Sequence, residues 1–190
     1  EEAAEKHFLD SLTALLVPEV MEARRLIDIG SGAGFPGIPL KVVRPELDVT
    51  LVDSVGKRVK FLETVIKDLN LQGISCYHAR AEEMGQDEKH REKYDVAIGR
   101  AVANLAVLSE YLLPLVRPGA VMVAMKGPAG SDELKEAKAA LEELGGSGRD
   151  LVEIALPGGD VRQLVVIRKA GRTPKRYPRR PGVPQKVPLM

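Results

Sequence analysis

The chain has 190 residues, 44% of them hydrophobic, which is enough to bury one core, so we expect a single domain rather than two. The single cysteine, Cys76, excludes an internal disulfide, and no apolar run approaches the length that crosses a bilayer. The net charge of +1 conceals an asymmetry, because residues 168–190 carry eight basic side chains and no acidic one. The rest of the chain is therefore acidic overall.

The first predicted element is a helix over residues 1–17, which ends before Pro18. Its apolar side chains at helical spacing predict a face packed on the rest of the domain: Phe8, Leu12, Leu15 and Leu16. His7, Asp10 and Ser11 share another part of the helix surface. This polar stripe is either solvated or borders a substrate cleft.

The next segment, residues 26–37, predicts a buried parallel strand that runs into a nucleotide-binding turn. Gly30, Gly32 and Gly34 permit a sharp turn and let a ligand lie against the main chain. The glycine spacing also fits a dinucleotide site, so an NAD-dependent oxidoreductase is one alternative. Asp28 favours S-adenosylmethionine instead, because a carboxylate attracts the ammonium of a methionine moiety and repels a pyrophosphate.

Two further strand ends supply candidate cofactor residues. Asp53 ends a strand over residues 48–53, where its carboxylate can accept hydrogen bonds from ribose hydroxyls; alternatively it starts a helix, a role Ser54 can also fill. The strand over residues 74–77 is followed by Ala81 and Glu82, expected beside an adenine. The alternative is a helix start whose acids complement the dipole.

The fourth strand, residues 94–101, places Arg100 at the carboxyl edge of the sheet, where ligands bind in open α/β folds. Its guanidinium is expected to hold the cofactor or an RNA phosphate, with a structural ion pair as the alternative. No Asn/Asp-Pro-Pro-aromatic sequence and no cysteine stands there. This argues against methylation of exocyclic amines and of cytosine C5.

The last strands complete the predicted fold. Residues 119–125 form a fifth strand that ends at Lys126, either an RNA-phosphate contact or a solvated lysine. Residues 151–156 and 161–167 form a closing hairpin. We therefore predict an α/β protein with a doubly wound, mostly parallel, seven-stranded Rossmann-like sheet and a C-terminal antiparallel strand, spanning residues 1–170.

Residues 171–190 form a basic, proline-rich tail, which we expect to be extended rather than helical. Its cations and its tyrosine suit a polyanion, with phosphates supplying affinity and the ring a stacking surface. The alternative is a tail that solubilises the chain and packs on the body. The candidate RNA-binding residues are Arg172, Lys175, Arg176, Tyr177, Arg179 and Arg180.

Together these segments closely resemble the bacterial small-subunit ribosomal RNA guanine-N7 methyltransferases, also called glucose-inhibited division protein B. The matching stretches are residues 6–12, 28–39, 80–82, 99–103, 126–127 and 172–179. The Gly-Phe-Pro-Gly extension of the glycine turn and the Thr-Pro-Lys-Arg-Tyr-Pro-Arg run are specific to this family. The chain departs from it at Gly99, where serine is more usual, and lacks the helical segment that normally precedes residue 6.

The resemblance implies methylation of a guanine in the 530 loop of 16S RNA at N7, with S-adenosylmethionine as donor and S-adenosylhomocysteine as product. It implies cofactor contacts at Gly30, Phe35, Asp53, Ala81, Glu82 and Arg100. N7 carries a lone pair and no proton, so no general base is needed, only positioning, in which Arg100 takes part. A non-catalytic RNA-binding or cofactor-sensing protein is the alternative from another class.

We expect a cytoplasmic monomer that acts on 16S RNA or the 30S subunit, without a metal site and without membrane contact. The exact nucleotide, and the choice between free RNA and an assembled subunit, stay open at this point.

Overall fold

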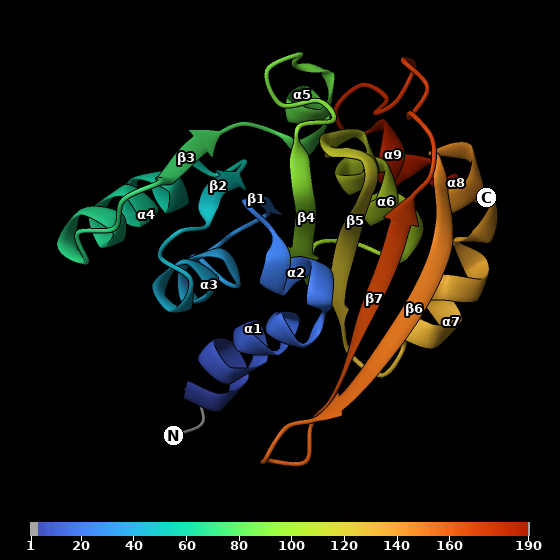
Figure 1. The fold of residues 1–190 in the computed structure, drawn as a ribbon. Coiled ribbons are helices and arrows are strands. Elements are labelled where there is room, and N and C mark those ends of the chain that lie inside the picture. The colour runs from blue at the N-terminus through green and yellow to red at the C-terminus, as the bar shows by residue number, and fades with distance from the viewer. Residues whose placement is uncertain (1–3, 190) are drawn as a thin grey trace.

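The computed structural model describes residues 4–189, which form one seven-stranded sheet in the order β3-β2-β1-β4-β5-β7-β6. The strands β1 to β5 pair in parallel, while β7 runs antiparallel to both β5 and β6. The predicted fold class is therefore confirmed (Figure 1). The strands are β1 (Arg25–Ile29), β2 (Asp48–Asp53), β3 (Ile74–His78), β4 (Tyr94–Arg100), β5 (Val116–Lys126), β6 (Gly146–Ala155) and β7 (Val161–Lys169).

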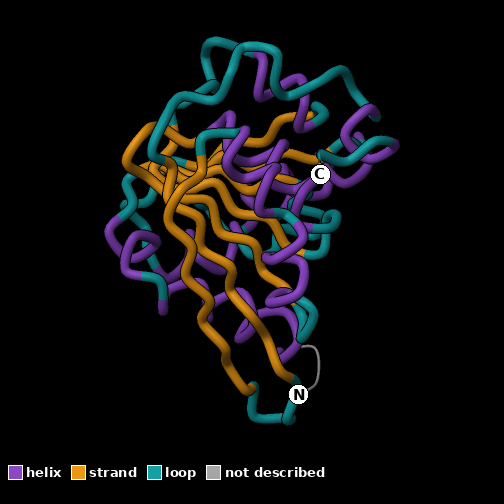
Figure 2. Tube along the Cα trace, turned by 90° about the vertical axis from the view of Figure 1, so that its right-hand side faces the viewer, coloured by secondary structure: helices purple, strands orange, loops and turns teal. Residues whose placement is uncertain are grey.

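Helices cover both faces of the sheet, as Figure 2 shows. Consecutive residues of β1 alternate between two cores: Leu26 packs in one with α2, α3 and α4, and Ile27 in the other with α5, α6 and α8. This burial on both faces explains the nearly continuous apolar run of the central strands. The helices are α1 (Asp10–Leu12), α2 (Pro18–Glu22), α3 (Gly37–Val43), α4 (Gly56–Asp68), α5 (Ala81–Gln86), α6 (Leu105–Leu112), α7 (Gly130–Glu136), α8 (Lys138–Glu143) and α9 (Val183–Lys186).

The amino-terminal segment differs from the predicted amphipathic helix. A π-helical turn over Ala4–Leu9 leads into α1 and then into a 3-10 turn over Thr13–Leu16, while residues 1–3 lie outside the described part of the chain. Phe8 and Leu16 are 53% and 59% exposed, whereas Asp10 and Ser11 are buried. The expected inward apolar face is therefore only partly present: Leu12 and Leu15 are half-buried, and the most deeply buried side chains of this segment include the polar residues Asp10 and Ser11.

The tail over residues 171–189 also differs from the prediction. It folds back on the domain and includes the short helix α9, in which Pro184 occupies the first turn, where its missing N–H is tolerated. Tyr177 and Pro184 are buried. The tail thus packs on the body, as the alternative interpretation held. Across residues 4–189, none of the helices combines the length and apolar character that spanning a membrane requires.

Candidate cofactor and substrate site

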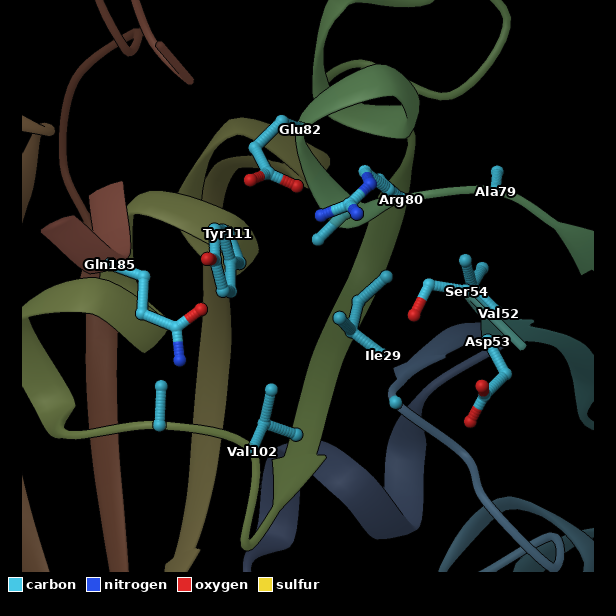
Figure 3. Close-up of a pocket in the computed structure, with 13 residues that line it drawn as sticks. Ile29, Val52, Asp53, Ser54, Ala79, Arg80, Glu82, Val102, Tyr111 and Gln185 are labelled. Carbon is cyan, nitrogen blue, oxygen red and sulfur yellow. The ribbon is translucent and has the colours of Figure 1, made fainter. Parts of the chain in front are cut away.

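Two cavities open at the carboxyl ends of the parallel strands, one on each side of Gly30. The first cavity, of about 170 Å³, is bounded by the ends of β1 and β2 and by the start of α5 (Figure 3). The second cavity, of about 680 Å³, lies between the glycine turn, the end of β4 and the amino-terminal segment. Gly30 lines both cavities, so its main chain is a wall that the two cavities share.

The glycine turn requires backbone angles that only glycine adopts easily. Gly30, Gly32 and Gly34 have φ of +74°, +58° and +99°. A Cβ on Gly30 would lie 2.8 Å from a methyl carbon of Val102, a residue of the first cavity's wall. Gly32 lines the second cavity, whereas the buried Gly34 lines neither and packs against Ile38. Gly34 therefore shapes the turn instead of contacting a ligand.

Asp28 is placed differently from its predicted role. Its side chain is fully buried, lines neither cavity, and accepts a hydrogen bond from the main-chain N–H of Gly37 at the start of α3 (3.0 Å). Within residues 4–189 its other oxygen, Oδ1, has no hydrogen-bond partner. Burial raises the pKa of this carboxyl to about 7. Asp28 therefore positions the start of α3, and its side chain lies behind the walls of both cavities and not in them.

Asp53 stands where the sequence predicted, at the end of β2 and in the wall of the first cavity. Its Oδ2 accepts a hydrogen bond from the Gly32 N–H, and its Oδ1 accepts one from the Val55 N–H, each at 2.9 Å. These bonds tie the glycine turn to the strand end, and Arg58 also lies 3.5 Å from Oδ2, so Oδ1 is the oxygen that keeps a further lone pair. Ser54 follows it in the same wall, with its side chain exposed.

The far wall of the first cavity combines predicted and unpredicted residues. Ala81 and Glu82 begin α5, as the alternative interpretation held, and both also line the cavity. Tyr111 of α6 and Gln185 of α9 also line it, on the side opposite Asp53 (Figure 3). Sequence reasoning missed these two, because neither belongs to a local motif and only the folded tail brings α9 to the cavity.

A buried ion cluster borders the second cavity. Arg100 contacts Asp10 through Nη1 and Oδ2 at 3.0 Å, and Arg162 of β7 approaches the other oxygen of Asp10 at 3.4 Å. The Arg100 guanidinium lies over the Phe35 ring, 5.3 Å from its centroid, and His7 stacks on the same ring. The polar stripe of the amino-terminal segment therefore borders this cavity. Nothing in the sequence singled out Arg162, because its partner Asp10 lies far away along the chain.

Lys126 is not the solvated lysine that one of its two interpretations required. It lines the second cavity, but its Nζ forms an ion pair with Glu133 at 2.7 Å and donates to the Ala103 carbonyl. Its side chain is only 9% exposed, so it is not a solvated lysine. Its ammonium is engaged within the protein, which leaves it poorly placed for an RNA phosphate.

The tail residues fall into two groups. Tyr177 is buried in the core, so its ring offers no stacking surface, and the guanidinium of Arg179 is taken up by the buried carboxylate of Glu110. Arg176 is exposed and pairs with Glu143. Among the described residues, the exposed tail cations Lys175, Arg180 and Lys186 form no ion pair, whereas the exposed Arg172 lies 3.8 Å from a carboxylate oxygen of Glu92.

The residues of the first cavity fit the nucleoside part of S-adenosylmethionine. Asp53 and Ser54 offer oxygen atoms for ribose hydroxyls, and Gly30 allows a ligand to lie against main chain that a Cβ would crowd. The start of α5 provides main-chain N–H groups beside the cavity. A nucleoside in the first cavity would direct its 5′ substituent past Gly30 toward the second.

The sheet order and the position of these cavities define the fold of S-adenosylmethionine-dependent methyltransferases. The fold is similar to that of the methyltransferase SibL, with a TM-score of 0.64 and 16% identity over 86% of this chain and 55% of the other. It is also similar to Atu636 from Agrobacterium tumefaciens, a predicted O-methyltransferase, with a TM-score of 0.65 and 21% identity over 86% of this chain and 81% of the other.

The particular family follows from the sequence comparisons. The model of the family "GidB: rRNA small subunit methyltransferase G" matches residues 1–157. Ribosomal RNA small subunit methyltransferase G of Clostridium botulinum (strain Loch Maree / Type A3) is 48% identical over the whole chain and 80% of the relative's length. The protein of the same name from Desulforamulus reducens is 50% identical over the whole chain and 79% of its length. The chain belongs to this family, so the predicted resemblance is confirmed and the NAD-dependent alternative is wrong.

Proposed function

We propose that this chain transfers the methyl group of S-adenosylmethionine to N7 of a guanine in the 530 loop of 16S ribosomal RNA. Membership of the ribosomal RNA methyltransferase family supports the cofactor and the substrate class. The structural observation that carries the proposal is the position of Gly30 between the two cavities. The nucleoside of the cofactor occupies the first cavity, and the target base enters the second.

The donor supplies a methyl group on a positively charged sulfur, which an in-plane lone pair such as that of guanine N7 attacks directly. The chain therefore has to supply positioning, which contributes about 7 to 11 kcal/mol in well-oriented reactions. Asp53 anchors the ribose, while Arg100, held by Asp10 and Phe35, orients the groups that meet beside Gly30. The base leaves its stack to reach this point, and the exposed His7 ring offers it a surface.

The direct test is transfer of labelled methyl to 16S RNA, comparing free RNA with 30S subunits, followed by mapping of the modified base. Label at N7 of a 530-loop guanine is the expected result, and the preferred substrate shows when in ribosome assembly the enzyme acts. Cofactor binding without transfer to either substrate would support a non-catalytic RNA-binding or cofactor-sensing protein instead.

The second cavity provides a sharper test through Asp10. Asp10→Asn keeps an oxygen for Arg100 but removes the charge that holds Arg100 and Arg162 together. We expect turnover on RNA to fall about tenfold, as one lost charged hydrogen bond allows, with a smaller change in S-adenosylhomocysteine affinity. The matched control is Asp160→Asn, because Asp160 pairs with Arg162 at the exposed hairpin end, 3.2 Å away. Equal losses in the two variants would contradict a role for Asp10 in the site.

A ribosomal substrate places this activity in the cytoplasm, and the two cavities are built from one chain. We therefore include a cytoplasmic, monomeric enzyme in the proposal. Light scattering on the protein with and without cofactor tests whether it is a monomer. A measured mass of two chains would overturn that part of the proposal.

A further inference from the structure

The carboxyl-terminal tail is fixed to the domain by buried polar contacts. Arg179 forms a two-pronged contact with Glu110 of α6, at 2.6 Å and 2.9 Å, and the carboxylate of Glu110 is fully buried. Arg91 donates to the main-chain carbonyls of Thr173 and Tyr177 at 2.8 Å and 2.7 Å. These contacts hold the tail at a defined place instead of leaving it as a solvated extension.

The same tail reaches the cofactor cavity beyond Arg179. The N–H of Gly182 donates to Oε1 of Glu82 at 2.8 Å, so the tail bonds directly to a residue of the first cavity. Directly after Gly182, α9 begins and lies beside α6 (Figure 1). The side chain of Gln185 projects from α9 into the cavity wall, beside Tyr111 and across from Asp53 (Figure 3).

We propose that Gln185 is a cofactor-contacting residue that reads the adenine of S-adenosylmethionine, so that the tail forms one wall of the cofactor site. The inference rests on the proposed function, because Asp53 must hold the ribose for the adenine to lie toward α5 and α9. A carboxamide matches adenine in chemistry. Its oxygen accepts from the N6 amino group while its nitrogen donates to N7, a two-bond pairing that other bases do not reproduce.

Glu82 and Gln185 then share the recognition of adenine. Glu82 presents its carboxylate from α5, and its bond to Gly182 fixes the distance between α5 and the tail. Gln185 supplies the donor that a carboxylate lacks. Residues 182–185 are therefore already in place for cofactor binding, and the tail is a component of the methyl-donor site.

The test is titration of the full chain with S-adenosylhomocysteine and with S-inosylhomocysteine, in which an oxygen replaces the N6 amino group. Gln185→Ala should weaken S-adenosylhomocysteine binding about fivefold, the scale of one neutral hydrogen bond. It should also reduce the preference for the adenosyl over the inosyl compound. The matched control is Lys186→Ala, since Lys186 is an exposed neighbour on α9 outside the cavity wall.

The outcomes separate this inference from the proposed function. If the unaltered chain binds S-adenosylhomocysteine while Gln185→Ala shows the same affinity and the same preference, the role of Gln185 is overturned and the proposed function stands. If the unaltered chain does not bind S-adenosylhomocysteine, the proposed function fails and this inference fails with it. Circular dichroism of both variants verifies that the fold is retained.

Discussion

The buried carboxyl of Asp28 holds the start of α3 through one hydrogen bond, but burying its charge lowers the stability of the folded chain. Its side chain packs under the start of α3, and a Cβ on Gly37 would lie 2.3 Å from Cδ2 of Leu51 and 2.9 Å from Oδ2 of Asp28. Glycine is therefore required opposite it, which explains the last glycine of the turn in structural terms. Asp28, which the sequence suggested as a ligand contact, accepts a hydrogen bond from the Gly37 N–H and so holds the start of α3 against β1.

The raised pKa of Asp28 gives a pH dependence with a definite sign. Burial raises the pKa in the folded chain from 3.8 to about 7, so the folded state binds this proton more tightly than the unfolded state does. The stability of the wild-type chain relative to Asp28→Asn should therefore fall as the pH rises from about 4 to about 7, and then level off. The upper limit of the change is about 4 kcal/mol. Urea unfolding of both proteins at several pH values measures it, and a constant difference would contradict the assignment.

Asp53 holds the glycine turn through the Gly32 N–H and is also the expected ribose contact. Its replacement should therefore lower the affinity for the cofactor. Asp53→Asn keeps one acceptor oxygen and gives up the charge and the second acceptor. We expect S-adenosylhomocysteine to bind about tenfold more weakly, as loss of a charged hydrogen bond allows. Calorimetric titration measures this. Asp48→Asn is the control, because Asp48 lies exposed at the opposite end of β2; matching affinities in the two variants would refute the assignment.

At the scale of elements, the sheet was predictable and the tail was not. Alternating apolar runs and glycine turns are local signals, and they correctly predicted the parallel strands and the closing hairpin. The placement of the tail depends on Arg179 meeting Glu110, which are 69 residues apart in the sequence. The inward polar stripe likewise depends on Asp10 meeting Arg100 and Arg162. Charged side chains look solvated in a sequence unless their distant partners are known.

The contact between α6 and the tail predicts a large effect from one acidic residue. Glu110→Ala removes the buried partner of Arg179 and should destabilise the chain by about 2 kcal/mol. It should also make the tail sensitive to trypsin after Lys175 and Arg179. Denaturant unfolding and limited proteolysis measure the two effects.

A second ion pair in the same tail serves as the control for Glu110. Glu143 pairs with Arg176 at an exposed position, with 39% and 69% of the two side chains accessible. Glu143→Ala should cost less than about 0.5 kcal/mol, because exposed ion pairs contribute little. If both variants lose the same small amount, the tail is not anchored through Glu110.

At the scale of the whole molecule, the structure shows where the basic and acidic parts of the chain meet. The basic tail lies against an acidic body, and part of its charge is neutralised there, through Arg179 with Glu110 and Arg176 with Glu143. Sequence alone does not reveal which cations are consumed in this way. The remaining exposed cations lie on the same tail that walls the first cavity, so RNA and cofactor approach neighbouring parts of the molecule.

This arrangement predicts a salt-dependent contribution of the tail to RNA binding. Replacing Arg172, Lys175 and Arg180 together by glutamine should weaken binding to 16S RNA. The slope of log affinity against log salt should become shallower by about 0.7 to 0.9 for each phosphate that the tail no longer neutralises. S-adenosylhomocysteine affinity should stay unchanged, because none of these side chains lines the first cavity. Filter binding at several salt concentrations, with calorimetry for the cofactor, measures both quantities.

The control for the tail cations is a triple glutamine variant of Lys57, Lys60 and Lys67, which are exposed on α4, at the opposite edge of the sheet from the tail (Figure 1). The control removes the same charge from the molecule as the tail variant does. If net charge alone governed binding, both variants would weaken affinity and salt dependence equally, and that result would contradict a tail interface. A reduction confined to the tail variant locates the RNA at the tail, since an exposed cation acts over about one Debye length, roughly 8 Å at physiological salt.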